Sequence, residues 1–185
     1  MPPETAADAT AIDRWLEQLS LVPIERAERE GVVSWDLVLD GRRRFDIRVT
    51  LIFAPALGLV GWVHYAPALG DSFRKSYRRF LRWNDELPFA KFALSEDERP
   101  VLTAELPADT VDRERLGALI ARLLAICDLL LDDSAHWLWA KGRIPPVSGR
   151  ASRGAALLDR YAVELAELQP PTADDAADPG GSEPD

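Results

Sequence analysis

The sequence predicts an α+β protein in which an antiparallel sheet packs against helices. Apolar residues recur with a period of two between Trp35 and Tyr65, as in half-buried strands, and the period becomes that of an amphipathic helix from Ser72. Two more short strand patterns and a long, mostly apolar helical pattern follow. The expected order is therefore helix, three strands, helix, two strands, helix, with one more helix near the C-terminus.

The first helix is expected to begin at Thr10, because Thr10 and Asp13 have the spacing of a capping box. Residues 1–9, which precede it, are mostly Pro, Ala and acidic residues, and we expect them to form a disordered leader. The apolar stripe of this helix consists of Ile12, Trp15, Leu16 and Leu19.

The first two strands are expected to form a hairpin. Residues 35–39 and 45–53 both carry apolar side chains at every second position. Between them lies Asp40-Gly41, a dipeptide that favours a tight turn because glycine tolerates positive φ. A third strand is expected over residues 59–65, and both of its faces are partly apolar, so the pattern leaves its orientation open.

The second half of the chain is predicted to contain a helix, a hairpin and the longest helix. The helix that begins near Ser72 ends before Pro88, and its apolar stripe consists of Phe73, Tyr77, Phe80, Leu81 and Leu87. A charged loop joins strands over residues 89–94 and 101–106. The longest helix follows Asp112, a good N-cap, and its apolar face consists of Leu116, Leu119, Ile120, Leu123, Leu124, Cys127, Leu130 and Leu131.

We expect residues 10–133 to form one globular domain. Residues 134–168 are expected to add an aromatic segment, a Pro- and Gly-rich linker and an extra helix over residues 155–168. Residues 169–185 consist mainly of Pro, Gly, Ala and acidic residues, so a disordered acidic tail is expected there.

The composition narrows the choice of partners and compartment. Asp and Glu total 31 against 22 Lys and Arg, and the net charge of -9 disfavours nucleic acid and anionic membranes as partners. Pro and Gly residues interrupt the uncharged run from Val49 to Gly70, so we interpret it as a soluble hairpin rather than a membrane span. The single cysteine, Cys127, and the lack of a signal-peptide pattern at the start favour the cytoplasm.

No residue pattern in the sequence predicts catalysis, a cofactor or a metal. Cys127 lies in an apolar helical stripe and is interpreted as a core thiol. His64 and His136 have no Cys or His at the spacing of metal ligands. Glycine-rich phosphate-binding loops are missing from the sequence as well. We therefore expect no catalytic, cofactor-binding or metal-binding residues, and a protein that is not an enzyme.

Asn84 is a polar residue in the middle of an apolar stripe, where its amide requires hydrogen-bond partners. We expect it to bond free backbone groups where the second helix gives way to the next strand, and so to act structurally. The neighbouring Trp83 is expected at the rim of the core.

A basic segment is the most informative feature of the surface. Residues 42–82 hold nine Arg or Lys and two Asp, so this segment carries +7 while the remainder carries -16. Five of these residues are expected on the side of the second helix opposite its apolar stripe, a basic face made of Arg74, Lys75, Arg78, Arg79 and Arg82. Two interpretations stay open: a solvated face neutralised by the protein's own acids, or a partner-binding face.

The segment Phe80 to Leu94, in which Asn84, Leu87-Pro88 and Lys91-Phe92 are the most recognisable positions, resembles the helix-to-strand junction of the YbjN-like family of bacterial sensory transduction regulators. The resemblance covers about residues 10–133. It implies a type III secretion chaperone-like α+β fold, a homodimer and a role in binding other proteins. It implies no cofactor and transfers no catalytic residue.

The leading hypothesis is a non-enzymatic protein-interaction module of chaperone-like or regulatory type, with an unidentified protein partner. One alternative is a small-ligand-binding domain or an enzyme whose pocket is built from dispersed residues. A closed polar cavity with converging carboxylates would favour that alternative. Another is a DNA-associated regulator, whose binding would fall steeply with salt.

Overall fold

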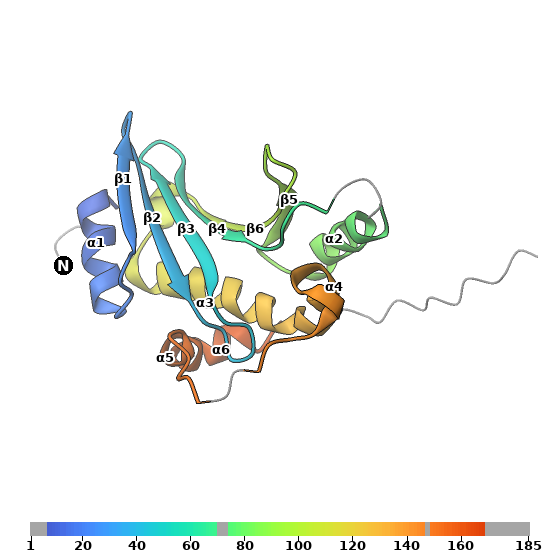
Figure 1. Ribbon diagram of the computed structural model, residues 1–185. Helices are drawn as coiled ribbons and strands as arrows, with labels where there is room; N and C mark the ends of the chain where they lie inside the picture. Colours follow the sequence, from blue (N-terminus) through green and yellow to red (C-terminus); the bar gives the residue numbers. More distant parts are fainter. Residues whose placement is uncertain (1–6, 70–73, 147–148, 169–185) are drawn as a thin grey trace, which may run out of the picture.

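A six-stranded antiparallel sheet with the strand order β1-β2-β3-β4-β6-β5 forms the centre of the protein in a computed structural model (Figure 1). The structure describes residues 7–69, 74–146 and 149–168. The strands are β1 (Glu25–Arg29), β2 (Val32–Leu39), β3 (Ile47–Ala54), β4 (Gly58–His64), β5 (Lys91–Leu94) and β6 (Pro100–Leu106).

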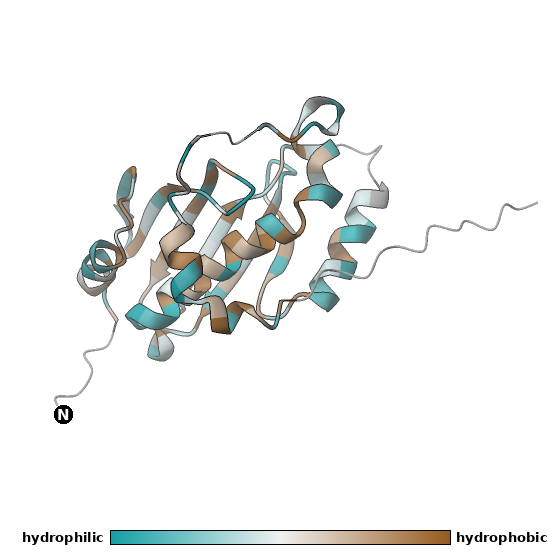
Figure 2. Ribbon diagram, turned by 90° about the horizontal axis from the view of Figure 1, so that it is seen from below, coloured by the Kyte–Doolittle hydropathy of each residue, from teal (hydrophilic) through white to brown (hydrophobic). Residues whose placement is uncertain are grey.

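The helices of the described residues lie on one side of the sheet, and none of them covers the opposite face (Figures 1 and 2). They are α1 (Ala9–Gln18), α2 (Arg74–Glu86), α3 (Arg113–Leu129), α4 (Leu131–Leu138), α5 (Ala155–Arg160) and α6 (Ala162–Leu165), with short 3-10 turns at Ala108–Thr110 and Ala140–Gly142. The predicted α+β class is confirmed, and the elements follow the predicted order with one added strand, β1, and one added helix, α4, which includes part of the expected aromatic segment. Within the described ranges, no helix has the length and apolarity needed to cross a bilayer.

The core forms between the sheet and α3. Residues at every second position of β2 and β3 are buried, and the predicted apolar face of α3 is buried along its full length. Gly61 of β4 brings the two layers close, since a Cβ atom there would lie 2.5 Å from a methyl carbon of Leu119. A side chain at this position would push α3 away from the sheet.

Strand β1 is an element that the sequence did not predict. All five of its residues are exposed and four are charged, so it has no apolar alternation. It forms because its backbone pairs with β2 at the edge of the sheet. Charged side chains on such an edge also disfavour pairing with another chain.

The connection between β2 and β3 corrects the prediction of a tight turn at Asp40-Gly41. Strand β2 ends at Leu39, β3 begins at Ile47, and the positive φ in this loop belongs to Asp46. Gly41 serves a different purpose, because a Cβ atom there would lie 2.3 Å from an Asp128 carboxylate oxygen. The glycine therefore permits close approach of the loop to α3.

Helix α2 is rotated relative to the predicted stripe. Leu81 is 69% exposed, whereas Trp83 is 1% exposed and belongs to the core rather than its rim. The buried face follows Phe80, Trp83 and Leu87, the i, i+3, i+7 spacing of one helix face. Phe80 lies 4.8 Å from Phe92 between ring centroids and joins an aromatic cluster with Trp83.

Both ends of the described chain differ from the predicted boundaries. The N-cap of α1 is Asp8, whose side chain accepts a hydrogen bond from the Ala11 N–H at 2.7 Å, so the helix starts before Thr10. The extra helix expected over residues 155–168 is divided into α5 and α6. Buried Leu157, Leu158 and Tyr161 join the main hydrophobic core. Residues 1–6 of the predicted leader and the predicted tail over 169–185 lie outside the described residues.

Candidate functional site

The predicted basic face lies on α2. Arg78 and Arg82 are exposed, while Arg79 is half-buried, forms an ion pair of 3.2 Å with Asp133 and lies over the Trp83 ring. Arg74 and Lys75 begin the helix, but their side chains fall outside the part of the chain that the structure describes. The described part of the basic face therefore consists of Arg78, Arg79 and Arg82.

An exposed leucine lies between these arginines. Leu81 follows Arg78 by three residues and precedes Arg82 by one, and residues three or four apart are neighbours on a helix surface. The outer surface of α2 is thus basic and apolar together. The sequence pattern had assigned Leu81 to the core, so this mixed character was missed.

Asn84 makes two hydrogen bonds to the backbone of Phe92. Its Nδ2 donates to the Phe92 carbonyl at 3.0 Å, and its Oδ1 accepts from the Phe92 N–H at 2.6 Å. Phe92 belongs to β5, the edge strand of the sheet. The amide therefore satisfies backbone groups that an edge strand would otherwise leave unpaired.

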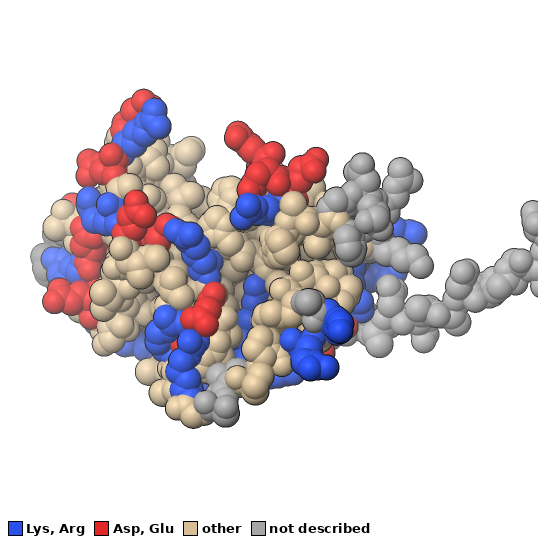
Figure 3. All heavy atoms as spheres, in the orientation of Figure 1, with Lys and Arg blue, Asp and Glu red and all other residues tan. Residues whose placement is uncertain are grey.

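Several other residues of the basic segment pair with the chain's own acids. Arg42 contacts Asp159 at 2.6 Å, Arg43 contacts Asp132 at 2.7 Å, and Arg48 contacts Asp36 at 3.0 Å. These pairs fit the interpretation of a self-neutralised surface. In Figure 3, Lys and Arg atoms lie mainly along the lower half of the face, while Asp and Glu atoms gather at β1 and at the β5–β6 turn.

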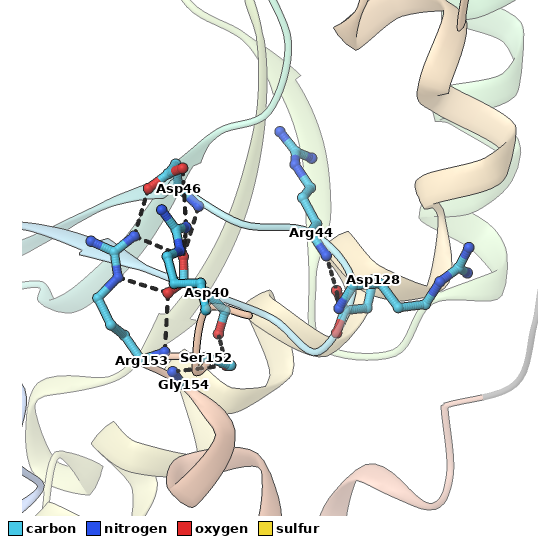
Figure 4. Close-up of polar contacts among 9 residues, drawn as sticks. Asp40, Arg44, Asp46, Asp128, Ser152, Arg153 and Gly154 are labelled. Carbon is cyan, nitrogen blue, oxygen red and sulfur yellow. Dashed lines mark hydrogen bonds and ion pairs between the residues drawn. The ribbon is translucent and has the colours of Figure 1, made fainter. Parts of the chain in front are cut away.

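The loop over residues 40–46 is fixed by Asp128 of α3 (Figure 4). The Asp128 carboxylate accepts hydrogen bonds from three successive backbone N–H groups of Arg42, Arg43 and Arg44, the last at 2.7 Å. Three successive donors around one carboxylate hold the loop in a defined conformation. This arrangement sets the direction of the Arg44 side chain.

A buried carboxylate, Asp40, joins the same loop to the C-terminal segment. Its oxygens accept hydrogen bonds from Arg153 Nε at 2.7 Å, Arg150 Nη2 at 2.9 Å and the Asp46 N–H at 2.8 Å (Figure 4). Burial alone would raise the pKa of Asp40, but the bonds from Arg153 and from the backbone hold it well below its ordinary value. The carboxylate is therefore ionised at neutral pH and anchors the C-terminal segment.

Cys127 and His64 are two of the side chains whose potential reactivity the sequence raised. Cys127 is buried, and desolvation raises the pKa of its thiol to about 11. His64 is exposed on β4, where desolvation and the charge of Arg48 lower its pKa. Within the described residues, no group of three His, Cys, Asp or Glu side chains could hold a metal ion.

The sequence interpretation gave Asp40 only a role in a tight turn and did not identify Asp128, Arg44 or Arg153 as important positions. The sequence signal for these contacts was the run of three arginines directly after Asp40-Gly41, because adjacent positive charges are stabilised by acidic side chains nearby. Asp128 lies 84 or more residues away from the three arginines whose backbone N–H groups it binds. Asp40 lies 113 residues away from Arg153. Local patterns do not report contacts at that separation.

Comparisons with known proteins give a family and two similar structures. The family model YbjN, described as "Putative bacterial sensory transduction regulator", matches residues 8–134. A chain in the structure of the Yersinia pestis type III secretion chaperone SycH, in complex with a stable fragment of YscM2, is 18% identical at a TM-score of 0.47, and the match covers 66% of this chain and 98% of that chain. A chain of the ExsC–ExsE complex is also 18% identical at a TM-score of 0.47, with 67% and 94% covered.

A search of curated proteins found no match. The family match is the informative result, because it extends over well more than half of the 185 residues and covers the sheet together with helices α1, α2 and α3. The resemblance in the segment from Phe80 to Leu94 lies within it. The chain therefore belongs to the YbjN family of bacterial sensory transduction regulators.

Proposed function

We propose that the protein is a non-enzymatic protein-interaction module of chaperone-like or regulatory type, which acts in the cytoplasm as a homodimer. Its membership of a family of regulators supports a role exercised through contact with other proteins. The observation that carries the proposal is the outer surface of α2, on which Leu81 is 69% exposed beside Arg78 and Arg82.

This surface suits an acidic partner segment that also carries apolar side chains. Within the described residues, Arg78 makes no ion pair with a carboxylate of the chain, so it is available to a partner. Exposed ion pairs contribute only about 0–1 kcal/mol, so burial of Leu81 would supply most of the affinity.

An enzyme is the less favoured alternative. One cavity is lined by four arginines, His64, Tyr65 and a single carboxylate, that of Asp46, and ion pairs with Arg150 and Arg153 already hold that carboxylate. This arrangement supports a binding role instead of catalysis.

Position-specific cross-linking tests the proposed interface. A photo-reactive amino acid at position 81, in the full chain and in the native cell, is expected to yield a covalent adduct with a distinct protein. The control is the same amino acid at position 57, because Leu57 is 82% exposed in the turn between β3 and β4. Equal adduct patterns at both positions, or no protein adduct at 81, would refute an interface on α2.

The homodimer is proposed from the open face of the sheet. Ile52 of β3 and Val60 of β4 are direct cross-strand neighbours on this face, and both are half-buried, as is Trp62. A second copy could cover these side chains, since uncovered apolar area on a sheet commonly marks an interface. Light scattering at micromolar concentration should give about 41 kDa, twice the chain mass of 20.5 kDa. A mass of one chain would overturn the dimer.

A further inference from the structure

One cavity of the protein is lined both by residues within the family match and by residues that follow it. Its volume is about 680 Å³, within the range of about 300–1,000 Å³ that is typical of small-molecule sites. One side consists of residues 43–46, residues 64–67 and Arg99. The other consists of residues within 138–150, all beyond the end of the family match at residue 134.

Three of the four arginines that line this cavity already have acidic partners. Arg43 pairs with Asp132 at 2.7 Å, and Arg99 pairs with Asp97 at 2.7 Å. Arg150 pairs with Asp40 at 2.9 Å and with Asp46 at 3.1 Å. The charges of these three side chains are therefore largely balanced by the protein itself.

Arg44 is the exception. It is 7% exposed, its Nη2 donates to the Tyr65 carbonyl at 2.5 Å, and its guanidinium lies 4.6 Å from the centroid of the Tyr65 ring. Its Nη1 is buried and has no hydrogen-bond partner among the described residues. In Figure 4 the side chain points away from Asp128 and from the Asp40 cluster.

A buried cation with an unused donor is costly unless an anion compensates it. We propose that the cavity binds a small organic anion, a carboxylate on a flat apolar body, with the carboxylate paired to Arg44. This inference goes beyond the protein-interaction role proposed above, and none of the residues that line the cavity belongs to α2.

The walls of the cavity favour a flat apolar body on the ligand. The lining includes Trp139, Ile144 and Pro145 of the C-terminal segment and Phe45 of the 40–46 loop. Arg150 covers the Phe45 ring at 4.7 Å, which orients that ring. Aromatic and apolar walls with one precisely placed charge are characteristic of small-molecule sites.

The charge balance favours a carboxylate over a phosphate. Among the described residues, Arg44 is the one arginine of the cavity without a carboxylate partner, so a single negative charge completes the balance. A phosphate group carries up to two negative charges near neutral pH and would need a second unpaired cation. The proposed ligand class is therefore a monoanionic aromatic carboxylate.

Titration of the full chain with benzoate tests the proposal by NMR. We expect saturable shifts of the Trp139 indole and the Tyr65 amide with a dissociation constant of about 1 mM, as appropriate for a ligand of this size. Benzyl alcohol, which has the ring without the charge, and inorganic phosphate, which has charge without the ring, should each bind at least about tenfold more weakly.

A comparison of two arginine variants tests whether the carboxylate of benzoate binds at Arg44. Arg44→Gln should weaken benzoate binding at least about tenfold, whereas Arg14→Gln, on the exposed side of α1, should leave it unchanged. If Arg44→Gln does not fold, Trp139→Ala decides, because it removes an aromatic wall of the cavity and should weaken benzoate binding at least about threefold. Benzoate shifts that are absent, are matched by phosphate, or persist unchanged in the variants that fold would overturn the proposal.

Discussion

Replacement of Leu123 by aspartate is expected to unfold the protein. Leu123 is fully buried in the middle of α3 and packs against β4 at Gly61. A carboxylate there would lose its hydration without gaining a partner, at a cost of several kcal/mol. Because the total stability of such a domain is only about 5–15 kcal/mol, the folded state would no longer dominate. Circular dichroism during heating should show no cooperative transition.

The matched control for this change is Leu57→Asp. Leu57 is 82% exposed in the β3–β4 turn, so the same substitution there should alter the melting temperature little. A Leu123→Asp protein that melts cooperatively, like the control, would show that α3 does not form the centre of the core.

Asp40→Asn is expected to destabilise the protein by about 3 kcal/mol at neutral pH, because it removes one partner from a buried network of charges. The substitution keeps the shape of the side chain but places an amide N–H group against donors of Arg153 and Arg150. Urea denaturation measures the change in the free energy of unfolding. Asp159→Asn is the control, since the Arg42–Asp159 pair is exposed and should contribute less than about 1 kcal/mol.

The effect of Asp40→Asn should depend on pH in a defined direction. The folded-state pKa of Asp40 lies below its ordinary value of 3.8, so the ionised carboxylate stabilises the folded state fully above that value. This stabilisation is lost as the pH falls below 3.8 toward the folded-state pKa. The unfolding free energies of wild type and Asp40→Asn should therefore converge in acid, and a difference that stays constant down to pH 2 would contradict the role assigned to this carboxylate.

The fold could be predicted where side-chain periodicity reports burial. Strand β3 and helix α3 bury the residues that their patterns indicated. Strand β1 could not be predicted because backbone pairing with β2, rather than burial of side chains, holds it in place. The rotation of α2 was missed for a related reason: Leu81 and Trp83 are both apolar, and only packing decides which one faces the sheet.

The candidate sites were predictable only where partners are close in the chain. Asn84 and Phe92 are eight residues apart, and an amide within an apolar stripe pointed to such a contact. Asp40 and Arg153 are 113 residues apart. The cavity lined by Arg44 is likewise built from segments that meet only in the folded protein, so no local pattern could indicate it.

The interaction surface on α2 is tested most directly by the affinity of the protein that is cross-linked at position 81. Calorimetric titration of that purified partner should show at least about tenfold weaker binding to Leu81→Asp than to wild type, because a charge replaces an apolar contact in the interface. Leu57→Asp, the same substitution at an exposed site in the β3–β4 turn, should bind like wild type. Equal affinity of all three proteins would contradict an interaction surface on α2.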